Sequence, residues 1–143
     1  MQQRNADIDL TGKAGAKPAL PGNPLAMAVA NRDRQTLEMV RAAVRHKNVM
    51  LAYQPVVQAK NPKKIAFFEA LIRVLDETQR VIPAREFITV IEETELGRDI
   101  DCLALQKGLI AMVKVPNLRL SINMSARTIG YPPWMQILNH FLN

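Results

Sequence analysis

Two charged side chains stand inside an apolar run at residues 66–73, which has the sequence AFFEALIR. Such a run of aromatic and aliphatic residues is typical of a strand buried in a sheet. Glu69 and Arg73 lie four positions apart in it. Burying a charge costs free energy unless the charge is paired or binds a ligand or a metal ion. The partner of Glu69 therefore constrains both the fold and the function.

The residue types allow two explanations of this pair. One is a structural Glu69–Arg73 ion pair with Asn123 as a turn former, because most charges in strands are paired surface features. The other is a ligand site. A carboxylate and an amide oxygen, from Glu69 and Asn123, suit Mg²⁺ or Mn²⁺, and the planar guanidinium of Arg73 suits a phosphate. Gln54 joins this group if its strand is a neighbour, since ligands bind at strand ends in helix-covered sheets.

Strand and helix patterns alternate along the chain. Residues 1–22 contain few large apolar residues and predict a flexible N-terminal arm. Residues 23–48 predict a leading helix or helix pair, with Asn23 as the cap and Pro24 in the first turn. The later elements are strands near 50–57, 65–74 and 118–125, a helix opening at Ile82-Pro83, and helices near 99–112 and 132–143. This alternation predicts an α/β fold with a parallel, helix-covered sheet.

Three strands cannot complete such a sheet, because the last one would expose an apolar edge. Pro55 also places the first strand at an edge, a strand end or a bulge. We therefore expect a chain that is cut short or is completed by another chain, either a second copy of itself or a different partner.

Composition excludes several classes of protein. The chain has 143 residues and 48% hydrophobic residues, and its one cysteine, Cys102, rules out an internal disulfide framework. No membrane-spanning run or signal-peptide core is visible, so we expect a cytoplasmic location. The net charge of +6 includes no basic run of the kind that tracks nucleic acid. The charge fits a small phosphate-bearing ligand better than DNA, but taken by itself it favours a basic surface without a phosphate partner.

Four motifs in order carry a resemblance to a known family. They are YQPVV at 53–57, FEALIR at 68–73, PAREFITVIEET at 83–94 and LSINMS at 120–125. Together they resemble the EAL domain, a family of bacterial cyclic di-GMP phosphodiesterases in signal transduction. The resemblance runs from about Leu37 to about Leu138 and favours a functional role for Glu69.

The resemblance implies a fold and a set of site residues. The fold is the N-terminal part of a TIM-like barrel, with its first strand antiparallel to the others, and residues 49–143 form this partial domain. The implied reaction is hydrolysis of cyclic di-GMP to linear pGpG with Mg²⁺ or Mn²⁺. By the matching motifs, Glu69 and Asn123 are metal ligands, while Gln54, Arg73 and the backbone of Leu71 hold the dinucleotide.

The sequence also departs from the family pattern. The later metal-binding carboxylates and the catalytic lysine have no counterpart before Asn143, so we expect no complete catalytic set and no hydrolysis by this chain alone. A degenerate domain that binds cyclic di-GMP or a protein is the second hypothesis, and an interaction fragment with an open sheet edge is the third. Glu95 stands where the family usually has Gly, so Gly97 is expected to end a helix with positive φ.

Overall fold

The computed structural model describes residues 23–142, and the arm predicted at 1–22 lies outside them. The first described element is helix α1 (Pro24–Arg45), which is continuous and carries proline in its first turn. The Asn23 side chain accepts a hydrogen bond from the Leu25 backbone N–H at 3.0 Å, as expected of a cap. The leading helix is therefore confirmed as a single helix.

The next two strands form a long antiparallel hairpin, β1 (Val49–Gln58) and β2 (Asn61–Leu75). β2 begins four residues before the predicted start at Ile65, because pairing with β1 continues almost to the turn. β1 lies at the edge of the sheet, where Pro55 costs no ladder hydrogen bond to a further strand. The edge position predicted for this proline is correct.

The segment after β2 differs from the prediction. Ile82 and Pro83 do not open a helix but end a short strand, β3 (Val81–Pro83), which pairs antiparallel with the end of β2. A 3₁₀ turn, η1 (Ala84–Glu86), and the short helix α2 (Ile88–Ile91) follow. Pairing with β2 overrides the helix-start signal of the proline. The expected inward side chains Phe87 and Ile91 are nevertheless fully buried.

The C-terminal part of the described chain contains two longer helices around a short strand. Helix α3 (Glu95–Lys114) begins four residues before the predicted start at Asp99, and helix α4 (Pro132–Leu142) follows the proline pair as expected. Between them lie β4 (Leu120–Ile122) and the 3₁₀ turn η2 (Ala126–Thr128). The alternation at 118–125 thus predicts the right strand but overestimates its length.

Gly97 does not have the expected role. It lies in the first turn of α3 rather than at a helix end, and among the described glycines the one with positive φ is Gly130. A Cβ atom at Gly97 would lie 2.7 Å from the carbonyl oxygen of Ile91 and 3.1 Å from Cα of Glu92. Glycine is therefore needed for close approach between α3 and the end of α2.

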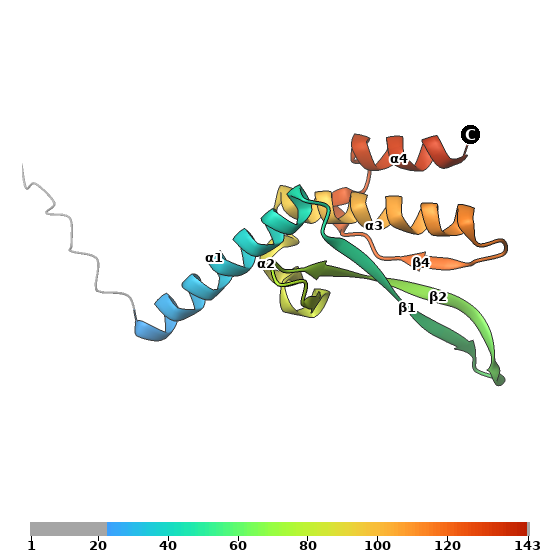
Figure 1. Cartoon of the computed structure of the whole chain (residues 1–143), viewed down its shortest axis with the longest axis horizontal. Helices are drawn as coiled ribbons and strands as arrows, with labels where there is room; N and C mark the ends of the chain where they lie inside the picture. The colour runs from blue at the N-terminus through green and yellow to red at the C-terminus, as the bar shows by residue number, and fades with distance from the viewer. Residues whose placement is uncertain (1–22, 143) are drawn as a thin grey trace, which may run out of the picture.

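The four strands form one mixed sheet with β2 in the middle. β2 pairs antiparallel with β1 on one side, and on the other side it pairs antiparallel with β3 and parallel with β4. The purely parallel sheet predicted from alternation is wrong, whereas the antiparallel first strand implied by the family resemblance is present. Figure 1 shows α3 and α4 on the same side of the sheet, with α1 projecting away from it.

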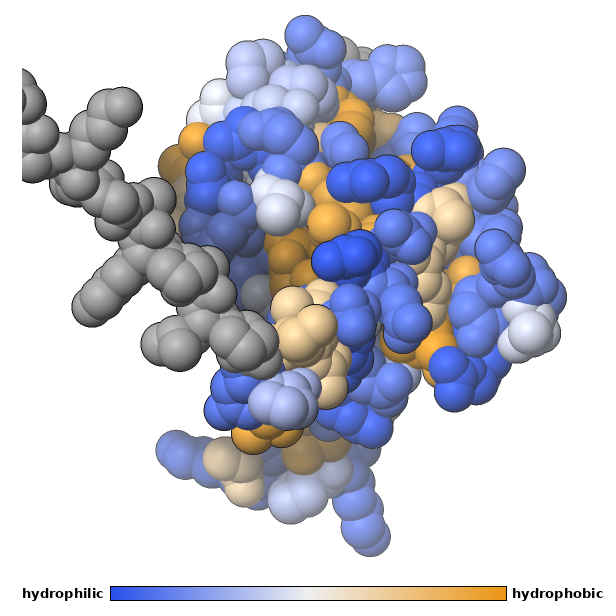
Figure 2. All heavy atoms as spheres, turned by 90° about the vertical axis from the view of Figure 1, so that its left-hand side faces the viewer, coloured by the Kyte–Doolittle hydropathy of each residue, from blue (hydrophilic) through white to orange (hydrophobic). Residues whose placement is uncertain are grey.

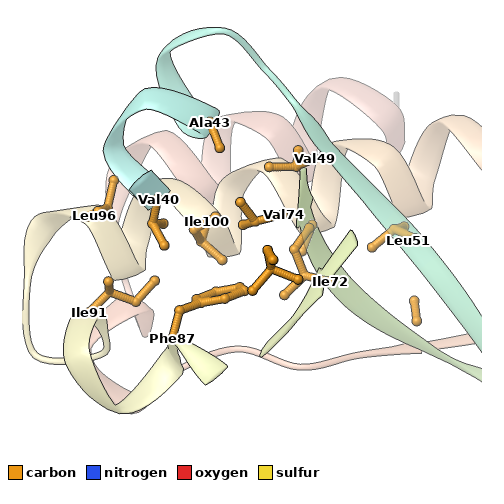
Figure 3. Close-up of a cluster of buried hydrophobic side chains, with 13 residues drawn as sticks. Val40, Ala43, Val49, Leu51, Ile72, Val74, Phe87, Ile91, Leu96 and Ile100 are labelled. Carbon is orange, nitrogen blue, oxygen red and sulfur yellow. The ribbon is translucent and has the colours of Figure 1, made fainter. Parts of the chain in front are cut away.

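The hydrophobic core lies between one face of the sheet and helices α1, α2 and α3 (Figure 3). Phe87 is at its centre, fully buried and surrounded by side chains from all of these elements. The other members of this cluster include Val40, Val49, Ile72, Val74, Ile91 and Ile100. Along β2 the buried residues are Ala70, Ile72 and Val74, so the alternate positions face away from the core.

The molecular surface is mostly hydrophilic where α1 faces the viewer in Figure 2, with hydrophobic residues in the gaps between polar ones. Several exposed apolar side chains belong to the first turns of α1, where Leu25 and Met27 are 70% and 58% exposed. Within residues 23–142, none of the helices has the length and apolar character needed to cross a membrane.

Candidate functional site

The face of the sheet opposite the core collects the predicted site residues. Gln54 of β1 is the cross-strand partner of Glu69 in β2, and Glu69 is the partner of Ser121 in β4. Side chains at paired positions point to the same face of a sheet. Leu71 and Arg73, two and four residues after Glu69 in the same strand, share that face. The hairpin register therefore assembles residues that are far apart in the sequence.

Asn123 lies directly beside Glu69. Its side-chain Nδ2 donates a hydrogen bond to Oε1 of Glu69 at 2.9 Å, which joins residues 54 positions apart in the sequence. Glu69 is half-buried and Asn123 is exposed, so the pair stands at the solvent boundary. The partner that the buried-charge argument requires for Glu69 is thus an amide from the end of β4. The prediction that Glu69 and Asn123 share one place in the fold agrees with this geometry.

The structural ion pair considered for Glu69 and Arg73 is not formed. The four ion pairs in the described part of the chain involve other residues. The guanidinium of Arg73 instead donates through Nη1 to the carbonyl oxygen of Ile72 at 2.9 Å. Arg73 is half-buried on the open face and is not neutralised by Glu69, so its charge is available to an anion.

The donor set at Glu69 matches part of a site for a hard cation. A carboxylate and an amide oxygen are the ligand types that Mg²⁺ and Mn²⁺ prefer. In the structure Asn123 presents Nδ2 to Glu69, so a shared cation needs its amide turned over to present Oδ1. Among residues 23–142 no three His, Cys, Asp or Glu side chains are grouped as metal ligands. The described residues fit two positions of a metal site, not a full set.

A second polar cluster lies just behind Asn123 and was not predicted. Asp101 of α3 is 7% exposed, and its Oδ2 accepts hydrogen bonds from the backbone N–H and the hydroxyl of Ser125, each at 2.9 Å. The hydroxyl of Thr128, which is fully buried, donates to the same oxygen at 2.6 Å. The sequence periodicity could have predicted this buried carboxylate, because Asp101 falls on the buried stripe of α3 beside Ile100 and Ala104.

The turn after β4 makes a further contact with the rest of the chain. Arg127 of η2 donates through Nη1 to the backbone oxygen of Glu93 at 2.7 Å and to its carboxylate at 2.5 Å. This pair links the segment after β4 to the segment between α2 and α3. Arg127 is therefore engaged in holding the chain beside the site.

Clear pKa shifts occur at three groups in the part of the chain described. The Thr78 hydroxyl is the main cause that lowers the pKa of Asp76 to about 2. Burial, then the charge of Glu95, raises the pKa of Asp99. Burial also raises the pKa of Cys102, with smaller contributions from Asp99 and Asp101. These three groups lie in the β2–β3 turn and in α3.

Comparison with known families gives a match to the EAL domain over residues 37–143. Among curated proteins, the signaling protein YkoW of Bacillus subtilis is 32% identical over 123 residues, which cover 81% of this chain and 15% of that protein. An uncharacterized 76.5 kDa protein of Thiocystis violacea is 27% identical over 132 residues, covering 85% of this chain and 19% of that protein. The chain spans less than a fifth of either relative.

Solved structures give the same fold at lower identity. The FimX EAL domain of Xanthomonas citri, in complex with c-diGMP, has a TM-score of 0.65 and 18% identity, with 81% of this chain and 46% of that chain covered. The FimX EAL domain of Pseudomonas aeruginosa, bound to c-di-GMP, has a TM-score of 0.62 and 20% identity, with 76% and 46% covered. The described residues thus correspond to about half of such a domain.

Proposed function

The chain belongs to the EAL domain family, and from this membership we propose that it forms the first half of a cyclic di-GMP phosphodiesterase site. The substrate is cyclic di-GMP and the family reaction is hydrolysis to linear pGpG. The observation that carries the proposal is the contact of 2.9 Å between Asn123 Nδ2 and Glu69 Oε1 on the open face of the sheet. It brings together two motifs of the family pattern that are separate in sequence.

Each site residue has a role suited to its chemistry. Arg73 holds a phosphate of the dinucleotide, because its half-buried guanidinium is not neutralised by Glu69 and presents a planar set of donors. Gln54, paired with Glu69 across the hairpin, provides an amide for the guanine or ribose edge. The backbone of Leu71, between Glu69 and Arg73, lies against the ligand.

Glu69 and Asn123 would hold the divalent ion through their side-chain oxygens. Bound Mg²⁺ or Mn²⁺ supplies a Lewis acid that lowers the pKa of a water nucleophile and neutralises phosphate charge. Two protein ligands leave most of a six-coordinate shell to water or to other groups. We therefore propose that residues 1–143 by themselves bind cyclic di-GMP without hydrolysing it. Further carboxylates brought against this face by a completing partner would be required for turnover.

A second candidate function is that of a binding module, a degenerate domain that recognises cyclic di-GMP or a protein in signalling. It is favoured by the small number of acidic ligands near Glu69 in residues 23–142. The two functions differ in their use of metal. A phosphodiesterase half-site binds the dinucleotide more tightly with Mn²⁺, whereas a metal-free binding module binds it with the same affinity in Mn²⁺ and in EDTA.

Calorimetric titration with cyclic di-GMP tests the proposal. We expect saturable binding that weakens by at least about tenfold in Arg73→Ala, since hydrogen bonds to charged groups contribute roughly 1.5–3 kcal/mol. The matched control is Arg85→Ala, which removes an exposed arginine of η1 and should bind like the unchanged chain. Equal binding by Arg73→Ala and the control would refute the assigned role of Arg73.

Titrations in Mn²⁺ and in EDTA, together with chromatographic detection of pGpG, separate the candidate functions. Mn²⁺-enhanced binding that is lost in Glu69→Gln supports the phosphodiesterase half-site. Binding that is equal in both buffers supports the binding module. Measurable Mg²⁺-dependent formation of pGpG by purified 1–143 would contradict the expectation that two ligands are too few.

A further inference from the structure

Asn123 stands just past the end of its strand. β4 pairs with β2 at Leu120, Ser121 and Ile122, so the ladder ends one residue before Asn123. The Asn123 side chain is exposed and reaches Glu69 through one hydrogen bond. An exposed amide at a strand end has many accessible rotamers, and holding one of them requires a fixed backbone. The direction of Asn123 therefore depends on what holds the chain immediately after it.

Asp101 holds that chain. The two donors of Ser125, two residues after Asn123, and the hydroxyl of Thr128 converge on its Oδ2 at 2.9, 2.9 and 2.6 Å. Asp101 and Thr128 are 7% and 0% exposed. Hydrogen bonds to a buried carboxylate are charge-assisted and stronger than neutral ones, so the turn from Ser125 to Thr128 is fixed against α3.

We propose that Asp101 is a positioning residue, which fixes the turn after β4 so that the amide of Asn123 faces Glu69. This inference deepens the proposed function, because it assigns to α3 the orientation of one of the two metal-ligating side chains. Asp101 does not reach the ligand itself and acts through Ser125 and Thr128. This role accounts for a buried carboxylate among the apolar buried residues of α3.

The alternative is that Asp101 contributes to stability alone. The two roles differ in their effect on the side-chain orientation of Asn123. In the unchanged chain, Glu69→Gln should shift the side-chain amide resonance of Asn123 in ¹H–¹⁵N spectra, because it replaces a charged acceptor by a neutral one. In Asp101→Asn, the Asn123 amide should move to the position of a free amide, and adding Glu69→Gln should then shift it no further. In a variant whose backbone amide resonances stay as dispersed as those of the unchanged chain, this loss of coupling reports orientation and not unfolding.

Asp99→Asn is the matched control. Asp99 lies two residues earlier in α3, and its substitution by Asn makes the same chemical change at a side chain that is not the acceptor of the Ser125 and Thr128 hydrogen bonds. In Asp99→Asn, the effect of Glu69→Gln on Asn123 should persist in full. A folded Asp101→Asn protein that also retains this effect would overturn the proposal.

If Asp101→Asn does not fold, two variants of the residues that donate hydrogen bonds to Asp101 test the proposal instead. Ser125→Ala and Thr128→Val each remove a hydroxyl donor and leave the carboxylate in place. Each should weaken the coupling between Glu69 and Asn123, and their combination should weaken it further, because only the backbone N–H of Ser125 then remains hydrogen-bonded to Asp101. Full coupling in the folded double variant would equally overturn the proposal. The readout uses no cyclic di-GMP or metal, so failure of the proposed function leaves it intact.

Discussion

Asp76 organises the turn between β2 and β3 through a single side chain. Its Oδ1 accepts from the backbone N–H and the hydroxyl of Thr78 at 2.9 and 2.6 Å and from the Arg80 backbone N–H at 3.0 Å. Its Oδ2 accepts from Nε of Arg80 at 3.1 Å. Such donors favour the charged form, so the pKa of Asp76 falls from 3.8 to about 2, mainly because of the Thr78 hydroxyl.

This lowered pKa predicts how stability depends on pH. The carboxylate of Asp76 stabilises the folded chain fully above pH 3.8, and this contribution is lost as pH falls through the folded pKa of about 2. Asp76→Asn should therefore unfold at lower urea concentration at pH 6, and the difference from the unchanged chain should shrink toward pH 2. Glu77→Gln, which changes an exposed carboxylate of the same turn, should show no such trend.

The carboxyl resonance of Asp76 gives a direct check on this argument. Its titration midpoint in ¹³C spectra should lie well below the ordinary aspartate pKa of 3.8. A midpoint near the ordinary value of 3.8 would show that the Thr78 and Arg80 hydrogen bonds do not persist in solution.

At the scale of single elements, helix α3 contains two glycines with different surroundings. A Cβ at Gly97 would meet backbone atoms of Ile91 and Glu92 at 2.7 and 3.1 Å. A Cβ at Gly108 would meet Cδ1 of Ile122, which is the end of a side chain that can rotate away. Rigid backbone cannot yield in this way, so the same substitution has different consequences at the two sites.

Gly97→Ala should lower the free energy of unfolding by about 1–3 kcal/mol, as overpacking against a rigid neighbour does. Gly108→Ala should cost clearly less, because alanine gains roughly 0.5–1 kcal/mol of helix propensity that offsets the movement of Ile122. Urea denaturation of the two variants tests the difference. A larger loss in Gly108→Ala would contradict the close approach of α3 and α2.

Local signals predict the elements whose causes are local. The Asn23-Pro24 cap and α4 after its proline pair were predicted for this reason, whereas the antiparallel pairing of β1 with β2 was implied only by the family resemblance. β3 was missed because three residues carry no periodicity and become a strand through pairing with the end of β2. Glu69 and Asn123 lie 54 positions apart, so their spacing in the sequence could not predict the contact between them. The chemistry of the two side chains suggested a shared site, and the family motifs pointed to both residues.

At the scale of the whole molecule, the core and the candidate site occupy opposite faces of β2. Ala70, Ile72 and Val74 pack into the core, and Glu69, Leu71 and Arg73 lie on the open face. The alternation of side chains along a single strand thus separates the hydrophobic core from the face for which we propose ligand binding. Substitutions on the open face should leave stability nearly unchanged, and substitutions on the core face should leave ligand binding nearly unchanged.

Phe87→Ala and Arg73→Ala test this separation. Phe87 is fully buried at the centre of the core, and its truncation should cost about 3–5 kcal/mol, a large part of a typical domain's stability. Arg73→Ala removes a half-buried side chain with one hydrogen bond to Ile72 and should cost less than about 1 kcal/mol. Phe87→Leu, which keeps most of the apolar volume, should fall between them. If thermal melts showed equal losses for Phe87→Ala and Arg73→Ala, then weaker binding of cyclic di-GMP by the arginine variant would reflect unfolding, and the open face could not be treated as a separate site.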